Sequence, residues 1–322
     1  MCFIFLNKEI FLTLYAEFIF SIPHYKDRMA TPSSLNILFI LNPVSGGKKK
    51  INWEPVIRDY FSQLPHKINF FILTGKEKDS DSIQSIIKKL EAHRVVAVGG
   101  DGTISLVGKL LLNTGIPLGI LRGGSANGMA EELKIPANTT AALDIIVSGR
   151  IKSSDAIRIN DSDICFHLSD IGLNAQLIKY FDESRFRGMW NYARMMVKVL
   201  INGRLLRLHL KADNLDTTIS AYMVVIANAS KYGSGAVINP DTSISDGKFE
   251  LVVVRKISLS EFIKLFWSYQ SFNPSKVEIF QTTKAQIISR RKTSFQIDGE
   301  YKGKITKVDA EIFPSAINFL VK

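Results

Sequence analysis

Between residues 38 and 128 the sequence repeats one unit three times, a short apolar run followed at once by a glycine-rich turn. In the clearest copy the run 95–98 predicts a buried strand, and the turn after it contains Gly99, Gly100, Asp101, Gly102 and Thr103. A helical apolar pattern follows, so the unit aims backbone N–H groups and a helix dipole at an anion. The Asp101 carboxylate would repel a bare phosphate, which indicates a phosphate that arrives with Mg²⁺. A glycine-rich turn without a ligand is the alternative for any single copy.

The other two copies place similar loops after two further strands. The run 38–41 precedes Asn42, Pro43, Ser45, Gly46, Gly47 and the lysines 48–50, and the run 118–121 precedes Gly123, Gly124, Ser125 and Asn127. Short polar side chains of this kind bind phosphate or their own loop backbone. The spacing of a P-loop is absent. Because strand ends lie side by side in an open parallel sheet, the three loops predict one shared anion site.

The order of strand and helix patterns divides the chain. Strands and helices alternate over residues 35–153, which predicts an α/β domain with a parallel sheet and helices on both faces. Residues 154–305 read mainly as strands and predict an antiparallel β-sandwich. Residues 306–322 form a C-terminal segment that we expect to return to the first domain. Residues 1–34 form an extension that we expect to be disordered or a mis-assigned start, with an amphipathic membrane anchor as the alternative.

Bulk properties narrow the classes of partner. The net charge of +11, with 41 basic and 30 acidic residues, favours a nucleotide, a nucleic acid or an anionic membrane. No DNA- or RNA-binding motif accompanies the charge, so we expect no nucleic-acid partner. Two cysteines provide no disulfide framework, which fits a reducing cytosol. Two apolar helical stripes, near 187–202 and 258–270, suit either core packing or a lipid-binding cleft.

The loops, taken together and in order, resemble the diacylglycerol kinase catalytic-domain family, which includes bacterial soluble lipid kinases, sphingosine kinases and ceramide kinases. Residues 240–249 resemble the Asp-Gly segment of that family, and residues 295–300 resemble its Asp-Gly-Glu segment. The Gly-Gly-Asp-Gly turn alone is shared with NAD kinases and phosphofructokinases, so the resemblance implies an α/β domain of that type. It also implies that residues 35–153 bind nucleotide and residues 154–305 bind the lipid substrate.

The resemblance assigns roles to individual residues. It places ATP against Asn42, Pro43, Ser45, Gly46, Thr74, Gly99, Gly100, Asp101, Gly102, Thr103, Gly124, Ser125 and Asn127. Asp101 is expected to engage Mg²⁺. Glu300 is expected to be the general base, with Asp298 adjacent; the two would share one face of a regular strand, unless Gly299 bends it. A separate structural Mg²⁺ is expected at Ser243, Asp246 and Lys248, where a plain turn is the alternative.

Three positions depart from the family pattern, because Gly128 and Leu106 stand where acids are usual and Arg122 stands where proline is common. With these departures, the resemblance still implies a Mg²⁺-dependent kinase that phosphorylates a diacylglycerol- or sphingoid-like lipid at an anionic membrane surface. We expect a cytoplasmic, peripherally membrane-associated protein, and the sequence is compatible with a homodimer. The alternatives are an NAD kinase-like enzyme and a nucleotide-binding regulator with little catalysis.

Overall fold

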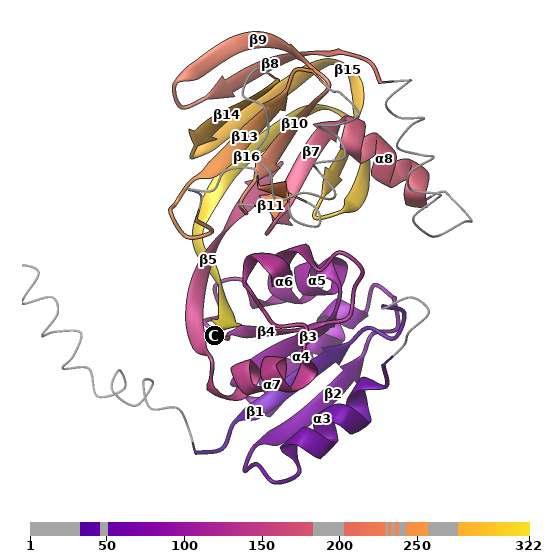
Figure 1. Ribbon diagram of the computed structural model, residues 1–322, viewed down its shortest axis with the longest axis vertical. Coiled ribbons are helices and arrows are strands. Elements are labelled where there is room, and N and C mark those ends of the chain that lie inside the picture. Colours follow the sequence, from indigo (N-terminus) through magenta and orange to yellow (C-terminus); the bar gives the residue numbers. More distant parts are fainter. Residues whose placement is uncertain are drawn as a thin grey trace, which may run out of the picture.

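The computed structural model describes residues 33–45, 51–182, 203–229, 231–232, 236–237, 243–256 and 276–322. Most of the predicted N-terminal extension, Gly46 and the two apolar helices near 187–202 and 258–270 lie outside the described residues. The described chain has an α/β part and a β-rich part, which are joined by two long strands (Figure 1).

The first part is built on four parallel strands. Their order in the sheet is β4-β3-β1-β2, and their bounds are Asn36–Leu41 for β1, Lys67–Ile72 for β2, Arg94–Gly99 for β3 and Leu118–Arg122 for β4. Every residue of β3 is buried, and five of the six residues of β1 are. Strands buried on both sides are typical of a parallel sheet that helices cover on both faces.

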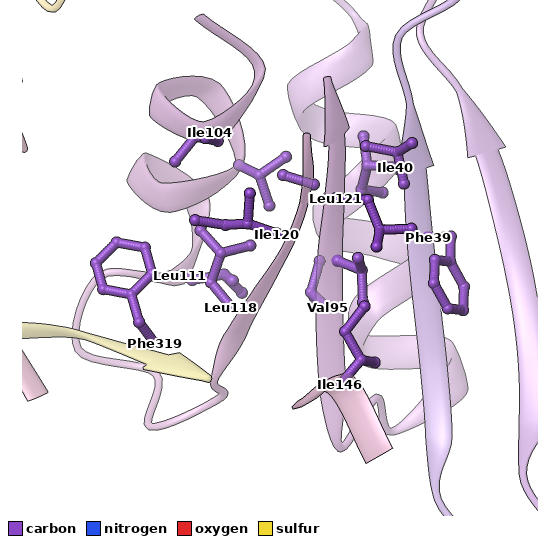
Figure 2. Packing of buried hydrophobic residues seen from close by; sticks show 14 of the residues in the cluster. Phe39, Ile40, Val95, Ile104, Leu111, Leu118, Ile120, Leu121, Ile146 and Phe319 are labelled. Carbon is purple, nitrogen blue, oxygen red and sulfur yellow. The ribbon is translucent and has the colours of Figure 1, made fainter. Parts of the chain in front are cut away.

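Helices supply that cover. They are α3 (Trp53–Phe61), α4 (Asp79–Leu90), α5 (Asp101–Leu111), α6 (Gly128–Glu132) and α7 (Thr139–Ser148). In α4, acidic residues in the first turn and lysines in the last complement the helix dipole. Helices α3 and α7 contact each other, as do α4 and α5. Figure 2 shows Phe39, Val95 and Leu121 within the buried cluster between the sheet and these helices.

The second part is almost entirely antiparallel. Its strands are β6 (Asp163–Cys165), β7 (Leu168–Gly172), β8 (Leu206–Ala212), β9 (Leu215–Ala221), β10 (Met223–Ala227), β13 (Phe249–Val254), β14 (Val277–Thr282) and β15 (Lys284–Ile297). The short strands β11 (Lys231–Tyr232) and β12 (Ala236–Val237) form a separate pair, and α8 (Leu173–Asp182) packs against β7 and β15. The predicted fold class, a parallel α/β domain followed by an antiparallel β-rich domain, is confirmed.

Two strands run through both parts. Strand β5 (Arg150–Ile159) pairs with β16 (Glu300–Val321) in two stretches, separated by an irregularity between Phe313 and Ile317. Beyond it β16 joins the first sheet, where Phe319 pairs in parallel with Leu118. Phe319 is fully buried and lies in the same cluster as Leu118 (Figure 2). The two parts therefore share one hydrogen-bonded ladder of strands.

Two stretches fold differently from their sequence patterns. Residues 218–227 have the pattern of one strand, but the chain is divided at Tyr222 into β9 and β10, which pair with different neighbours. Residues 285–289 and 293–297 have the patterns of two strands, but both belong to one strand, β15, with a register shift between Ile288 and Thr293. A bulge interrupts the alternation of side chains without ending the strand, so the pattern resembles a loop.

Candidate functional site

The three glycine loops meet at one edge of the parallel sheet. They follow β1, β3 and β4, which are neighbours in the sheet. Backbone hydrogen bonds join them, because the N–H of Asn42 donates to the carbonyl of Val98 at 3.0 Å and that of Gly123 donates to Gly99 at 2.8 Å. The sequence thus predicted correctly that these loops come together.

Close backbone packing explains the glycines of these loops. A Cβ atom on Gly124 would lie 2.5 Å from the Cα of Gly100, and one on Gly123 would lie 3.1 Å from both the Cα of Gly99 and the Oγ of Ser45. No side chain fits at Gly124 unless the backbone moves. We call the closely packed backbone of Gly99, Gly100, Gly123 and Gly124 the glycine surface. Helix α5 begins directly after Gly100, so the unpaired N–H groups of its first turn adjoin this surface. Such a surface of backbone N–H groups suits an anion.

The polar side chains of the first loop fix its shape. The amide of Asn42 donates from Nδ2 to Oγ1 of Thr103 at 2.9 Å and accepts the N–H of Val44 at 3.1 Å. The hydroxyl of Ser45 donates to the carbonyl of Asn42 at 2.8 Å. Thr103 is buried, whereas Pro43 is exposed. Asn42 and Thr103 thus join the first loop to the first turn of α5.

Asp101 joins the second loop to the third. Its carboxylate accepts the N–H groups of Gly128 and Met129, each at 3.0 Å, at the start of α6. Asn127 has a left-handed backbone with φ of 50°, and its amide exchanges two hydrogen bonds with the backbone of Gly124. Ser125 is exposed. The acid and the amide therefore hold the glycine surface together.

Arg122 and Leu106, which depart from the family pattern as Gly128 does, both contact neighbouring residues. Arg122 forms an ion pair with Glu131 and donates to the carbonyl of Ala130 at 3.3 Å, which ties β4 to α6. Leu106 packs against the first hydrophobic cluster.

Thr74 stands at the end of β2, beside the first loop. Its hydroxyl donates to Asp79 at 2.7 Å, and the N–H groups of Thr74 and Gly75 donate to the other carboxylate oxygen at 2.9 Å. The hydrogen bond from the Thr74 hydroxyl, followed by those from the backbone, lowers the pKa of Asp79. Asp79 thereby fixes the exposed turn that presents Thr74.

Asp298 lies in the turn between β15 and β16, with φ of 48°. Its carboxylate accepts backbone N–H groups from Phe166, His167 and Leu168 at 3.0, 2.9 and 3.2 Å. The Cys165 thiol donates to it at 3.4 Å, as does the Ser105 hydroxyl. Burial, and then the charge of Asp298, raises the pKa of the Cys165 thiol and keeps it protonated. The acid is a clamp between this turn, the β6–β7 connection and α5.

Glu300 has a different environment. Its side chain is 51% exposed and pairs with Lys302 at 3.2 Å. A Cβ atom on Gly102 would lie 3.8 Å from Oε1 of Glu300. Glu300 and Asp298 therefore both lie against α5, one beside Gly102 and the other beside Ser105. Because Asp298 and Gly299 both have positive φ, the two acids do not lie on one regular strand: Asp298 lies in the turn and Glu300 begins β16. Of the two acids, only Glu300 is exposed.

Sequence reasoning missed His167, which lies beside this site. The residue is 8% exposed, and a Cβ atom on Gly128 would lie 2.8 Å from its Cε1 atom. Its Nε2 atom is buried with no hydrogen-bond partner in the described part of the chain. The absence of a side chain at Gly128 makes room for the imidazole. A lone histidine in an apolar stretch offers no sequence signal of this arrangement.

The residues of the predicted second metal site lie in a hydrogen-bonded turn. The Asp246 carboxylate accepts the N–H groups of Ser243 at 3.4 Å and Lys248 at 3.0 Å. Gly247, with φ of 73°, donates to the buried Asp155 at 2.8 Å. Among the described residues, no cluster of three or more histidines, cysteines or acids could hold a metal ion. The bonds of Asp246 thus hold the turn closed.

Within the described ranges, no helix combines the length and the apolar character needed to cross a bilayer.

The fold and the glycine surface define a protein with a parallel α/β part, whose loops suit an anion, and an antiparallel β-rich part. Residues 36–159 match the model of the diacylglycerol kinase catalytic domain, and residues 169–321 match that of the YegS C-terminal NAD kinase beta sandwich-like domain. Together these matches span most of the chain, which belongs to the diacylglycerol kinase catalytic-domain family. The resemblance inferred from the motifs is confirmed.

Two individual proteins are similar to this chain in sequence. A Staphylococcus carnosus (strain TM300) protein named "Putative lipid kinase" is 27% identical over 69% of this chain and 75% of its own length. An uncharacterized protein of Synechocystis sp. is 28% identical over 87% of this chain and 68% of its own length.

Solved structures share the fold. The crystal structure of a diacylglycerol kinase from Bacillus anthracis str. Sterne covers 89% of this chain and 97% of its own, with a TM-score of 0.67 and 15% identity. A second structure from that organism covers 91% and 99%, with a TM-score of 0.72 and 17% identity.

Proposed function

We propose that this protein is a lipid kinase, which transfers the γ-phosphate of ATP to a hydroxyl group of a diacylglycerol- or sphingoid-like membrane lipid. Family membership and the names of its relatives support a kinase. The observation that carries the acceptor chemistry is the exposed Glu300 carboxylate beside Gly102, at the helix start that adjoins the glycine surface.

ATP would lie with its phosphates on the glycine surface. The close packing of Gly100 against Gly124 brings the backbones of two loops together, and the first turn of α5 offers N–H donors. The loops that carry Ser45, Thr74 and Ser125 surround this surface and would contact the nucleotide.

Mg²⁺ fits the donor set at Asp101. This ion needs only one or two carboxylates when the phosphates of a nucleotide supply further oxygens, and a carboxylate oxygen that accepts one N–H retains a lone pair. When bound, Mg²⁺ would neutralise charge on the phosphates. Asp101 would hold it there, and Asn127 and Gly128 would keep the loop in place.

Glu300 would act as the general base. As the lipid hydroxyl oxygen attacks the γ-phosphorus, its proton passes to the Glu300 carboxylate and the bond to ADP breaks. Asp298 is a positioning residue in this scheme, because its hydrogen bonds fix the turn that presents Glu300. Exposure of Glu300 suits a base that must meet a lipid supplied from a membrane.

The test is transfer of labelled γ-phosphate in mixed micelles to diacylglycerol, monoacylglycerol, sphingoid base, ceramide and phosphatidylglycerol, with NAD in a separate detergent-free reaction. We expect one lipid to be labelled and Glu300→Gln to lower kcat by roughly 100-fold or more. Asp101→Asn should also abolish transfer. The control is Glu311→Gln, which changes an exposed acid on the same strand as Glu300 and should leave transfer unchanged. Labelling of NAD would instead establish an NAD kinase. ATP binding without any transfer would indicate a regulator.

We propose further that the protein works in the cytoplasm at a membrane surface and that Asp246 binds a structural Mg²⁺. The second proposal is tested by melting the protein with and without a chelator. Loss of stability in the wild type, but not in Asp246→Asn, would support it. Equal melting of all four samples would leave only the hydrogen-bonded turn.

A further inference from the structure

The β-rich domain contains a basic cavity of about 670 Å³, formed between the start of α8 and strands β8 and β15. Six of its fifteen lining residues are cationic, and none is acidic. The cationic residues are Arg204, Arg207, Arg290, Arg291, Lys292 and Lys304. We refer to this cavity as the basic pocket.

A bulge in β15 produces half of this charge. The register between β15 and β16 shifts between Ile288 and Thr293, which pushes residues 290–292 out of the ladder, where all three are exposed. Hydroxyl groups of Ser289 and Thr293 donate to the carbonyl of Arg291 at 2.8 and 2.9 Å. The bulge is thus a fixed structure that presents three consecutive cations.

The lining of the basic pocket also contains apolar residues, among them Leu173, Leu205 and Leu206, and it is closely packed at Gly172. A Cβ atom on Gly172, whose φ is 121°, would lie 2.5 Å from the carbonyl oxygen of Tyr222 and 3.1 Å from Leu206. Glycine at this position leaves room for the Tyr222 carbonyl and the Leu206 side chain. Leu205, which follows Arg204 in the sequence, is 54% exposed. An exposed apolar side chain among cations suits the boundary between the headgroups and the acyl chains of an anionic membrane.

The cations of the basic pocket form no ion pair with a carboxylate in the part of the chain that the structure describes. Other lysines on the same strands do, since Lys284 pairs with Glu311 at 3.5 Å and Lys307 with Asp309 at 2.8 Å. Six positive charges around one cavity repel one another, and a bound anion would relieve that repulsion.

We propose that the basic pocket binds the phosphate headgroup of an anionic membrane phospholipid, with Leu205 inserted among the neighbouring lipids. This inference deepens the proposed lipid kinase function, on which it rests for the reason to meet a membrane. Ser294 pairs with Lys304 and Ile297 with Glu300, so the nearest edge of the pocket lies a few residues along the same hairpin, roughly 10–13 Å from the acid, and the bulge lies beyond it. A phospholipid held there would bring the membrane surface to Glu300.

The experiment measures binding of the full chain, without ATP, to vesicles of phosphatidylcholine with and without phosphatidylglycerol. Wild-type binding should require phosphatidylglycerol. The variant Arg290→Gln/Arg291→Gln/Lys292→Gln should bind on the order of 100-fold more weakly, because each cation near an anionic surface contributes about fivefold. The control Lys88→Gln/Lys89→Gln/Lys307→Gln removes equal charge elsewhere and should bind nearly as the wild type does.

Leu205→Ser keeps every charge and should still weaken binding by about tenfold, since burial of a leucine side chain is lost. Equal losses in the bulge variant and the control would overturn the proposal, because binding would then follow net charge alone. Displacement by inorganic phosphate at matched ionic strength, with no effect of Leu205→Ser, would also overturn it in favour of a soluble anion.

A second readout separates this inference from the proposed function. Transfer to a short-chain acceptor in detergent micelles should survive in the bulge variant, whereas transfer to acceptor in vesicles should fall. Vesicle binding through the basic pocket in a protein that labels no lipid would contradict the kinase and leave the pocket supported.

Discussion

Asp298→Asn distinguishes a clamp from a catalytic acid at the turn before Glu300. Asparagine tolerates the left-handed backbone of this position, where φ is 48°, and differs from aspartate by a single group. The carboxylate accepts hydrogen bonds from three backbone N–H groups, a thiol and a hydroxyl. An amide keeps one acceptor oxygen and turns an NH₂ group toward donors.

The magnitude follows from those bonds. If the amide oxygen takes the place of Oδ1, the N–H of Phe166 loses its acceptor, which costs about 1–3 kcal/mol for a buried donor. The bonds from His167 and Leu168 persist, but to a neutral acceptor, and each weakens by roughly 0.5–1 kcal/mol. We therefore expect a loss of about 3 kcal/mol in the free energy of unfolding. In a thermal melt followed by circular dichroism this corresponds to a fall of roughly 6 °C in Tm.

Glu300→Gln is the matched control, because it makes the same chemical change two residues away on an exposed side chain. Its Tm should stay close to that of the wild type. The reasoning is refuted if Asp298→Asn melts with the wild type and yet loses phosphate transfer as completely as Glu300→Gln. That result would make Asp298 a catalytic acid and its hydrogen bonds incidental.

Three further predictions concern the loops. Gly124→Ala places a Cβ atom 2.5 Å from the Cα of Gly100, which should lower the free energy of unfolding by about 1–3 kcal/mol. The variant should also bind an ATP analogue more weakly in calorimetry, and unaltered binding would contradict the close packing. The pKa of Asp79 is lowered in the folded state. Its carboxylate therefore stabilises the fold above the ordinary pKa, and this contribution disappears as the pH falls through the lowered pKa. The Tm difference between wild type and Asp79→Asn should be largest near neutral pH and vanish in acid. Gly128→Ala would place its methyl group 2.8 Å from the ring of His167, so a double-mutant cycle with His167→Ala should give a coupling above about 1 kcal/mol in urea unfolding, and strict additivity would argue against the contact.

Most of the fold could be predicted because its signals are local. Apolar runs bounded by glycine turns placed β1, β3 and β4 within one or two residues, and the change from alternating elements to strands placed the β-rich domain. Strand β16 escaped recognition, since a long, two-sided strand that crosses from one domain to the other has no single pattern of alternation. Its pairing with β5 depends on contacts far apart in the sequence.

The site was predictable in location and less so in detail. The three strand-and-loop units in the sequence predicted that the glycine loops lie together. The hydrogen-bond partners of a carboxylate depend on tertiary structure and could not be predicted in this way. Asp298 and Glu300 look equivalent in sequence, yet one accepts three backbone N–H groups and the other stands half exposed. Likewise, nothing in the sequence joins His167 to Gly128, and the cations of the basic pocket come from separated segments.

The pairing of Phe319 with Leu118 has a consequence for how the protein is made. The sheet that carries the glycine loops is completed by a strand that leaves the ribosome only after every strand of the β-rich domain. A nascent chain ending at residue 159, the limit of the matched catalytic domain, would leave β4 with an open edge and the site of Phe319 as an apolar gap. A segment that ends at residue 159 therefore lacks the strand that pairs with β4, and the sheet that carries the glycine loops is completed only after the C-terminal strand has been synthesised.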